Sequence, residues 1–162
     1  METLEYPRPV RLEPVDRPAV IAVIAAIGIA LLLGSAAASA SAPTTVVLGR
    51  KNLLRYGQGW GTPHPRVIFN GGDPSGRAWN LRWRGWGKPV ATAEGLTWIF
   101  RPTGGYYARP AAIELRASRI ARCVTDGPHA YTRLEAREAV RPSGPFGRWF
   151  AWGGWKSICI GP

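Results

Sequence analysis

The fold is decided by the stretch Ala78-Trp79-Asn80-Leu81-Arg82-Trp83-Arg84. Apolar and polar side chains alternate through it, which is typical of a β-strand with one buried face. The apolar set is Trp79, Leu81 and Trp83, and the polar set is Asn80, Arg82 and Arg84. The pattern therefore predicts a strand whose three apolar side chains lie together in the core and whose arginines face solvent.

Further short strands are expected around this one, separated by turns rich in glycine and proline. They are residues 66–70, 96–101 and 112–120 and part of the segment 148–160, with turns at 71–76, 102–105 and 126–128. In 112–120, Ile113 and Leu115 should point inward and Glu114 and Arg116 outward. Residues 131–139 fit either a helix, because LEAREA has high helix propensity, or a strand. The predicted fold class is all-β, mainly antiparallel, as a small sandwich or barrel.

An apolar segment near the N-terminus predicts export. No charged residue occurs from 18 to 49, and the 22 residues of 19–40 would form about 33 Å of helix, enough to span the ~30 Å hydrocarbon core. Arg8, Arg11 and Arg17 precede the segment and the next positive charge is Arg50, which favours an inside N-terminus. Small residues up to Ala40 would permit signal-peptidase cleavage, so 18–40 is a signal peptide or an uncleaved anchor helix.

The remaining boundaries follow from this segment. Residues 1–17 contain Pro7, Pro9 and Pro14 and are expected to be a disordered cytoplasmic tail. Residues 41–45 are a linker, and 46–162 form an exported β domain that is extracellular or membrane-anchored on the outer side. Cys123 and Cys159, the only cysteines, should pair in this oxidising setting, with Cα atoms roughly 4.4–6.8 Å apart.

The exported part is strongly basic. Of 21 Lys and Arg and 10 Asp and Glu, three and four respectively precede residue 41, which leaves 18 basic and 6 acidic residues, a count of +12. Arginine-rich surfaces suit polyanions, but a GC-rich coding sequence also favours arginine, and no run of five or six cations occurs. Both interpretations stay open, and no specific nucleic-acid partner is predicted.

Residues 73–87 (DPSGRAWNLRWRGWG), followed by Ala93-Glu94-Gly95, resemble an uncharacterised group of small exported Trp-Gly-rich β-domain proteins of high-GC Gram-positive bacteria. The Cys123 region and Ala130-Tyr131-Thr132 extend the similarity over about 65–134. The resemblance implies that Trp83, Trp86 and Gly87 are the group's marker residues, and it implies export and a β fold but no activity. The chain lacks the additional cysteine pair that many members carry near 100–105.

Eight tryptophans fall within this domain. We expect Trp79, Trp83 and Trp98 in the core. The other set neighbours glycines in expected turns and should be more exposed: Trp60, Trp86, Trp152 and Trp155. Beside them lie cations, which predicts a ligand-binding set made of Trp86, Trp152, Trp155, Arg84, Lys88, Arg148 and Lys156. The alternative is that these are core tryptophans in glycine-rich loops.

No catalytic, metal-binding or cofactor motif is present in the sequence. The acidic residues fit turns or solvent-facing strand positions: Asp73, Glu94, Glu114, Asp126, Glu135 and Glu138. His64 and His129 are expected on separate loops. The prediction is a non-enzymatic, exported or anchored module that binds cell-envelope polymer or an anionic membrane surface through exposed Trp and basic residues. The alternative is a structural or accessory subunit that binds a protein partner at the cell surface.

Overall fold

Of the 162 residues, the computed structural model describes 45–160. The predicted cytoplasmic tail, the apolar segment 18–40 and nearly all of the linker therefore lie outside the described residues. Between 45 and 160, the structure has no helix long and apolar enough to span a membrane.

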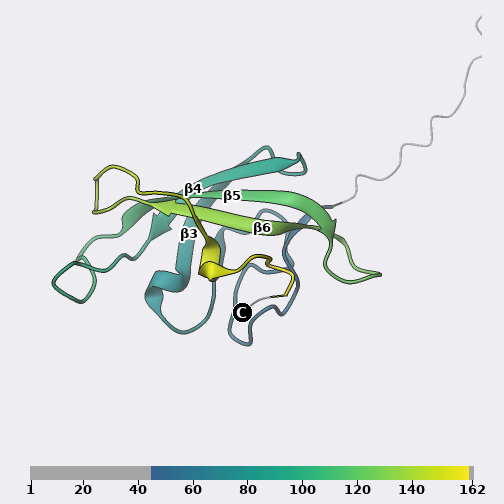
Figure 1. Ribbon diagram of the computed structural model, residues 1–162, viewed down its shortest axis with the longest axis horizontal. Coiled ribbons are helices and arrows are strands. Elements are labelled where there is room, and N and C mark those ends of the chain that lie inside the picture. The colour runs from purple at the N-terminus through teal and green to yellow at the C-terminus, as the bar shows by residue number, and fades with distance from the viewer. Residues whose placement is uncertain (1–44, 161–162) are drawn as a thin grey trace, which may run out of the picture. The chain divides into compact units, whose positions relative to one another are not determined.

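The described chain is all-β, as expected (Figure 1). Its strands are β1 (Val47–Leu48), β2 (Val67–Phe69), β3 (Arg77–Arg84), β4 (Val90–Thr97), β5 (Ala111–Arg122), β6 (His129–Glu138) and β7 (Phe150–Ala151). Two single turns of 3₁₀ helix accompany them, η1 (Pro74–Gly76) and η2 (Trp152–Gly154). Asp73 starts η1 by accepting a hydrogen bond from the Ser75 backbone N–H.

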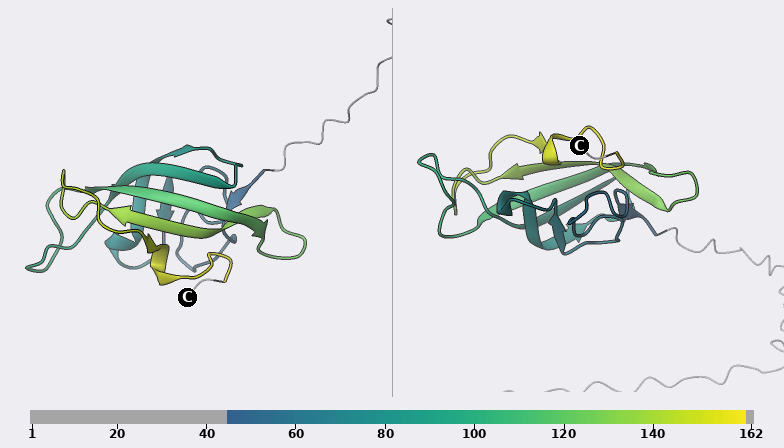
Figure 2. Two further views of the ribbon diagram at one scale, coloured as in Figure 1. Left: turned by 45° about the horizontal axis from the view of Figure 1, so that its top comes forward. Right: turned by 90° about the horizontal axis from the view of Figure 1, so that it is seen from below.

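All seven strands belong to one curled sheet in the order β1-β6-β5-β4-β3-β2, with β7 paired to β6. Every pairing is antiparallel except that of β1 with β6. The architecture is thus a mixed half-barrel, not two packed sheets (Figure 2). The segment 58–62 links the two edges, because Gln58 exchanges backbone hydrogen bonds with Phe69 of β2 and Gly61 donates to Leu48 of β1.

Alternation along the strands separates an inner face, which carries the core, from an outer face. Inward side chains include Ala91 and Ala93 of β4, Leu115 of β5, and Leu134 and Ala136 of β6. The long connections before β2 and after β7 cover this face and contribute Leu53, Trp60, Trp152 and Ile158, and β1 adds Leu48. As predicted, Ile113 and Leu115 are buried, while Glu114 and Arg116 lie on the outer face.

The predicted register of β3 is wrong at its start. Asn80 has a φ of +55°, and the pairing with β4 shifts between Trp79 and Arg82, so the strand contains a β-bulge. Residues before the bulge therefore point to the side opposite to the predicted one. Leu81 and Trp83 point inward, but Trp79 lies on the outer side. There its ring packs against Trp98, with centroids 5.7 Å apart.

The assignment of tryptophans to core and surface is corrected accordingly. Trp60 and Trp152, which were expected to be exposed, are buried at 5% and 2% exposure, and each indole N–H has an acceptor. Trp83 was predicted in the core; it is half-buried and packs against the core, so this prediction is met in part. Trp79 and Trp98, which were expected inside, are half-buried outside it.

The other predicted elements are confirmed in part. Residues 131–139, which fitted helix or strand, lie almost entirely in strand β6. The predicted strand 96–101 is instead the end of β4, which begins at Val90 and stops at Thr97. Cys123 and Cys159 form the expected disulfide, with Cα atoms 5.0 Å apart.

Candidate binding surface

Two rows of polar side chains run across the outer face of β3 to β6. Opposite residues in the first row are Arg82, Glu94, Glu114 and Arg137, and those in the second are Arg84, Thr92, Arg116 and Glu135. Side chains at paired positions on one face are close enough to interact. We call these eight residues, together with Arg133, the outer-face lattice. It contains five arginines and three glutamates and carries a net positive charge.

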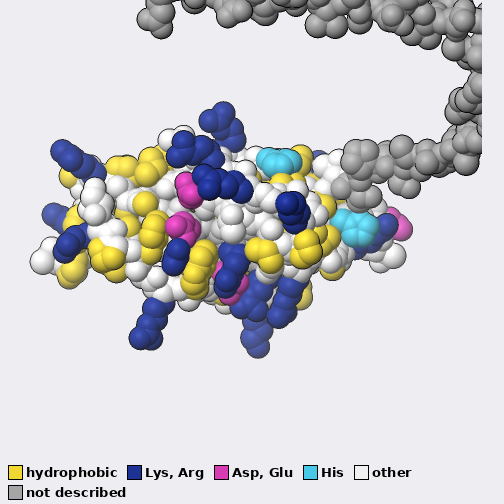
Figure 3. Space-filling model, turned by 90° about the horizontal axis from the view of Figure 1, so that it is seen from above, with side chains coloured by type: hydrophobic (Ala, Val, Ile, Leu, Met, Phe, Trp, Pro, Cys, Tyr) yellow, Lys and Arg dark blue, Asp and Glu magenta, His cyan; other side chains and the backbone are white. Residues whose placement is uncertain are grey.

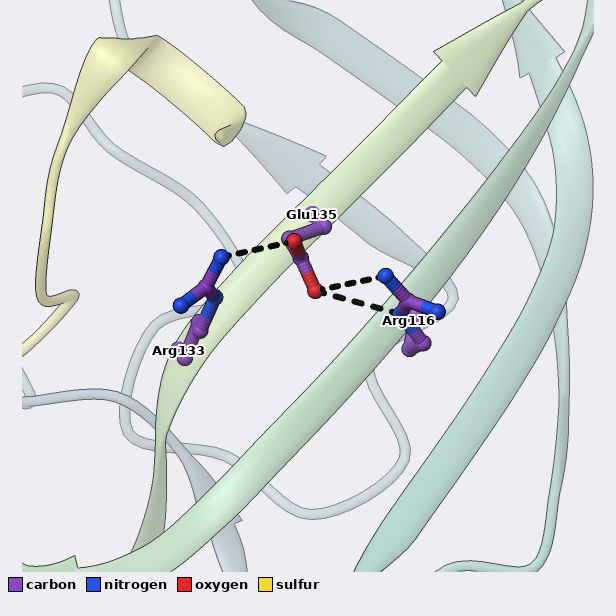
Figure 4. Close-up of polar contacts among 3 residues, drawn as sticks. All are labelled: Arg116, Arg133 and Glu135. Atoms are coloured by element: carbon purple, nitrogen blue, oxygen red, sulfur yellow. Dashed lines mark hydrogen bonds and ion pairs between the residues drawn. The ribbon is translucent and has the colours of Figure 1, made fainter. Parts of the chain in front are cut away.

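Ion pairs join most of this lattice. Glu135 accepts from Arg116 of the neighbouring strand at 3.0 Å and from Arg133 of its own strand at 2.8 Å (Figure 4). Arg137 binds Glu114 at 2.6 Å, and Arg84 lies 3.6 Å from Glu94. Among the described residues, Arg82 makes no ion pair within bonding distance.

Glu135 is held ionised by this arrangement. Partial burial alone would raise the pKa of its carboxyl group, but the hydrogen bonds and charges of Arg133 and Arg116 outweigh burial and lower the pKa below its usual value. Glu135 therefore stays ionised to a lower pH than an ordinary glutamate. Each surface ion pair of this kind contributes little to the free energy of unfolding. Stability alone therefore does not account for the clustering of arginines on this face.

Trp149 lies over the lattice. The guanidinium carbons of Arg116 and Arg137 are 4.7 Å and 5.0 Å from the centroid of its ring, so two cations contact one indole. Arg137 also lies 5.1 Å from the ring of Phe146. The segment between β6 and β7 thus adds aromatic surface to a face that is otherwise polar.

Two shallow grooves follow the lattice along the sheet. One, of about 580 Å³, is lined by Arg66, Asn80, Ala112 and Phe146 among others, and the second, of about 340 Å³, by Arg84, Arg116 and Trp149 among others. They share Arg82, Glu94 and Glu114, so they form one continuous depression. Figure 3 shows a side of the molecule on which Lys and Arg side chains surround a few acidic ones.

The tryptophans predicted for the binding site are engaged within the domain. Trp152 is buried, and its indole donates to Asn70 Oδ1 at 2.8 Å. Trp86 is half-buried between Trp83 and Tyr131 and donates to the Val46 carbonyl oxygen at 2.8 Å. Trp155 is half-buried against Trp60, at 5.9 Å between ring centroids. The expectation of an exposed indole is therefore wrong for Trp152 and met only in part for the other two.

The predicted cations are exposed but do not gather in one place. Arg84 belongs to the outer-face lattice, and Lys88 lies in the β3–β4 turn. Tyr131 anchors that turn by accepting from the Gly87 N–H and donating to the Lys88 carbonyl oxygen. Arg148 lines a separate groove, and Lys156 follows η2.

Sequence reasoning missed the role of Trp149, Arg116 and Arg137. Alternation predicts the outward position of Arg116 but not its partner on β6, because the sequence of residues 131–139 fits a helix as well as a strand. Taken as a strand, these residues place Glu135 and Arg137 on one face, next to Arg116 and Glu114. This alternation in residues 131–139 is the feature of the sequence that could have identified the outer-face lattice.

No three His, Cys, Asp or Glu side chains in residues 45–160 come together in a way that could hold a metal ion. Comparison of the chain with protein-family models, curated proteins and solved structures gives no significant match.

Proposed function

We propose that the chain is a non-enzymatic, exported module that binds an anionic polymer of the cell envelope through its outer-face lattice and Trp149. The observation that carries the proposal is the contact of Arg116 and Arg137 with one half-buried indole, inside a depression lined by further arginines. Guanidinium groups bind phosphate and carboxylate oxygens in pairs of hydrogen bonds, and an indole offers a flat apolar surface beside them.

The charge of the domain supports the same reading. Its excess of 12 positive charges would attract a polyanion, and the lattice supplies a place where such a polymer can lie along the sheet. The apolar segment 18–40 is proposed to be a signal peptide or anchor helix that puts the domain outside the cytoplasmic membrane. Membership of the resembled Trp-Gly-rich group is part of this proposal and implies the same location.

Titration with a purified polyglycerol phosphate tests the proposal. The detergent-solubilised full-length protein should bind it with an affinity that falls as salt is added. The double variant Arg82→Gln/Arg84→Gln should weaken binding at least threefold, while Lys51→Gln/Arg55→Gln, which removes the same charge from an exposed loop, should weaken it less. Equal loss in both variants would indicate attraction by net charge alone and would contradict an outer-face site.

A protein partner is the second candidate, and a specific observation favours it. Large apolar side chains are exposed at one end of the sheet, where they line a common groove: Phe100 at 55%, Val140 at 57% and Phe150 at 42%. Exposed apolar side chains that gather are common at protein interfaces. Crosslinking in intact cells separates the candidates, because a recurring protein adduct near these residues supports an accessory subunit.

A further inference from the structure

A third groove lies at the end of the half-barrel where β6 finishes. It measures about 570 Å³ and is lined by Glu138, Arg148, Ser75, Trp98, Phe100 and Phe150, among others. The loops 98–110 and 140–149 project at this end of the sheet (Figure 2). Its volume falls within the range of small-molecule sites, which is about 300–1,000 Å³.

Glu138 continues the inward row of Leu134 and Ala136. Its carboxyl group therefore lies at the edge of the core and lines the groove, whereas the sequence suggested a solvent-facing position. Burial raises its pKa to about 7, and among the described residues no cation pairs with it. The charged residue that shares the groove is Arg148. Near neutral pH, this carboxyl group can both donate and accept hydrogen bonds.

Aromatic rings line the same groove, and neighbours hold two of them in place. Phe100 stacks on Tyr106 with centroids 4.4 Å apart, and Trp98 packs against Trp79. Phe150 pairs with Ala136 in the sheet, so its side chain shares the face of Glu138, and it is 42% exposed. The rings and the carboxyl group are thus presented together, without a rearrangement of the backbone.

We propose that this groove binds a single pyranose unit of an uncharged glycan. One face of a pyranose ring carries C–H groups that pack against an aromatic ring, and its edge carries hydroxyl groups. The Glu138 carboxyl group and the Arg148 guanidinium are placed to bond those hydroxyls, since hydroxyls both donate and accept. The inference rests on the proposed envelope-binding function and adds a second, uncharged ligand class to it.

The test is a titration of the full-length protein with the neutral tetrasaccharides of glucose, mannose and N-acetylglucosamine, followed by NMR or intrinsic fluorescence. At least one should bind at concentrations up to about 10 mM, with little dependence on salt because no ligand charge is involved. Phe150→Ala should weaken that binding at least tenfold, since it removes an aromatic contact. The matched control is Phe146→Ala, which removes a similarly exposed phenylalanine that lines the outer face.

Three results would overturn the proposal. They are no binding of any tetrasaccharide, equal weakening by the two phenylalanine variants, and saturable binding of a peptide at Phe150 in place of sugar. Retained binding of polyglycerol phosphate by Phe150→Ala, together with loss of sugar binding, separates this groove from the outer-face lattice. Glu138→Gln keeps the hydrogen-bonding capacity of the protonated acid and should retain sugar binding at pH 6, whereas Glu138→Ala should lose it.

Discussion

Glu135 and Glu138 lie three residues apart on one strand but have opposite electrostatic surroundings. Glu135 faces outward, where Arg116 and Arg133 bond to it and lower its pKa. Glu138 faces inward at the end of the sheet, where burial without a paired cation raises its pKa to about 7. The period of two along a strand is enough to produce this difference, because neighbouring positions look onto different media.

The raised pKa of Glu138 makes stability depend on pH. The unfolded carboxyl group titrates near 4.5 and the folded one near 7, so the folded state binds the extra proton between these values and its free energy of unfolding falls as pH rises through them. Glu138→Gln removes this effect. After allowing for partial exposure, we expect the variant to gain about 1 kcal/mol over the parent on going from pH 4.5 to pH 8.

Urea unfolding at the two pH values measures this change. Glu114→Gln is a matched substitution at a carboxyl group that is paired with Arg137, and it should not gain stability at pH 8. If the free energy of unfolding differed between the parent and Glu138→Gln by the same amount at both pH values, Glu138 would not be buried as described.

Trp152 contributes a hydrogen bond as well as core volume. Trp152→Phe keeps most of the apolar surface but leaves Asn70 Oδ1 without its indole donor, and should cost about 1–3 kcal/mol. Trp155→Phe, at a half-buried ring, should cost less. Chemical denaturation of both variants tests this, and equal costs would contradict the assigned bond.

At the scale of elements, β3 and β5 change their inward face partway along, and β6 does so opposite β5, since Tyr131 and Leu134 are both buried. In β3 the change occurs at Asn80, and in β5 it occurs at Arg119, which has a φ of +60°. After Arg119, Ile120 packs against the core although Ala117 did so before it. The pairing of β3 with β4 shifts at Asn80, whereas the pairing of β5 with β6 keeps its register across Arg119, so the first change is a bulge and the second is not. A bulge bends its strand and increases the local twist, which favours one sheet that curls around its own core.

The bulge at Asn80 can be tested by substitution. Asparagine tolerates a positive φ, whereas a β-branched residue does not, so Asn80→Val should cost about 1–3 kcal/mol. Asn80→Gly should cost little, since glycine adopts this conformation readily. Thr92→Val, at an exposed and regularly paired position of β4, should also be nearly neutral. Thermal unfolding compares the three, and a neutral Asn80→Val would contradict the bulge.

The strands show what alternation can and cannot predict. Residues 78–84 and 112–120 were correctly predicted as strands because each has a long alternation of apolar and polar residues, and 66–70 because a short apolar run precedes a turn cluster. The side of the sheet predicted for Trp79 was wrong because Asn80, which has a positive φ, shifts the alternation by one residue. The sequence pattern does not show such a shift. The positions of Trp60 and Trp152 depend on how two long connections fold back over the sheet, which local patterns do not specify.

The disulfide connects distant parts of the whole domain. It joins Cys123, in the turn after β5, to Cys159, which follows the C-terminal segment that covers the inner face, with 36 residues of separation. In the chain-entropy model, closing a loop of this size stabilises by about 4 kcal/mol. The Cys123→Ser/Cys159→Ser variant should therefore lose roughly that amount in urea unfolding.

Reduction of the parent protein provides the control. Dithiothreitol should lower the stability of the parent towards that of the variant and leave the variant unchanged. Were the parent equally stable before and after complete reduction, the bond would not constrain the chain as described.

At the scale of the whole molecule, the described part, residues 45–160, presents two surfaces of different chemistry: an arginine-rich outer face and an aromatic groove at one end. The sequence predicted a basic domain with accessible aromatic residues, but it placed the contact at Trp86, Trp152 and Trp155. The structure instead brings together Trp149, Arg116 and Arg137, which come from separate elements. Their proximity depends on strand pairing, so no local motif could have shown it.

Arginine footprinting tests the central claim most directly. The full-length protein is modified with phenylglyoxal in the presence and absence of polyglycerol phosphate, and each arginine is scored by mass spectrometry. Binding through the outer face predicts protection of Arg82, Arg84, Arg116 and Arg137, with Arg55 and Arg101 modified equally in both samples. Protection spread evenly over all arginines, or none despite measurable binding, would contradict the account.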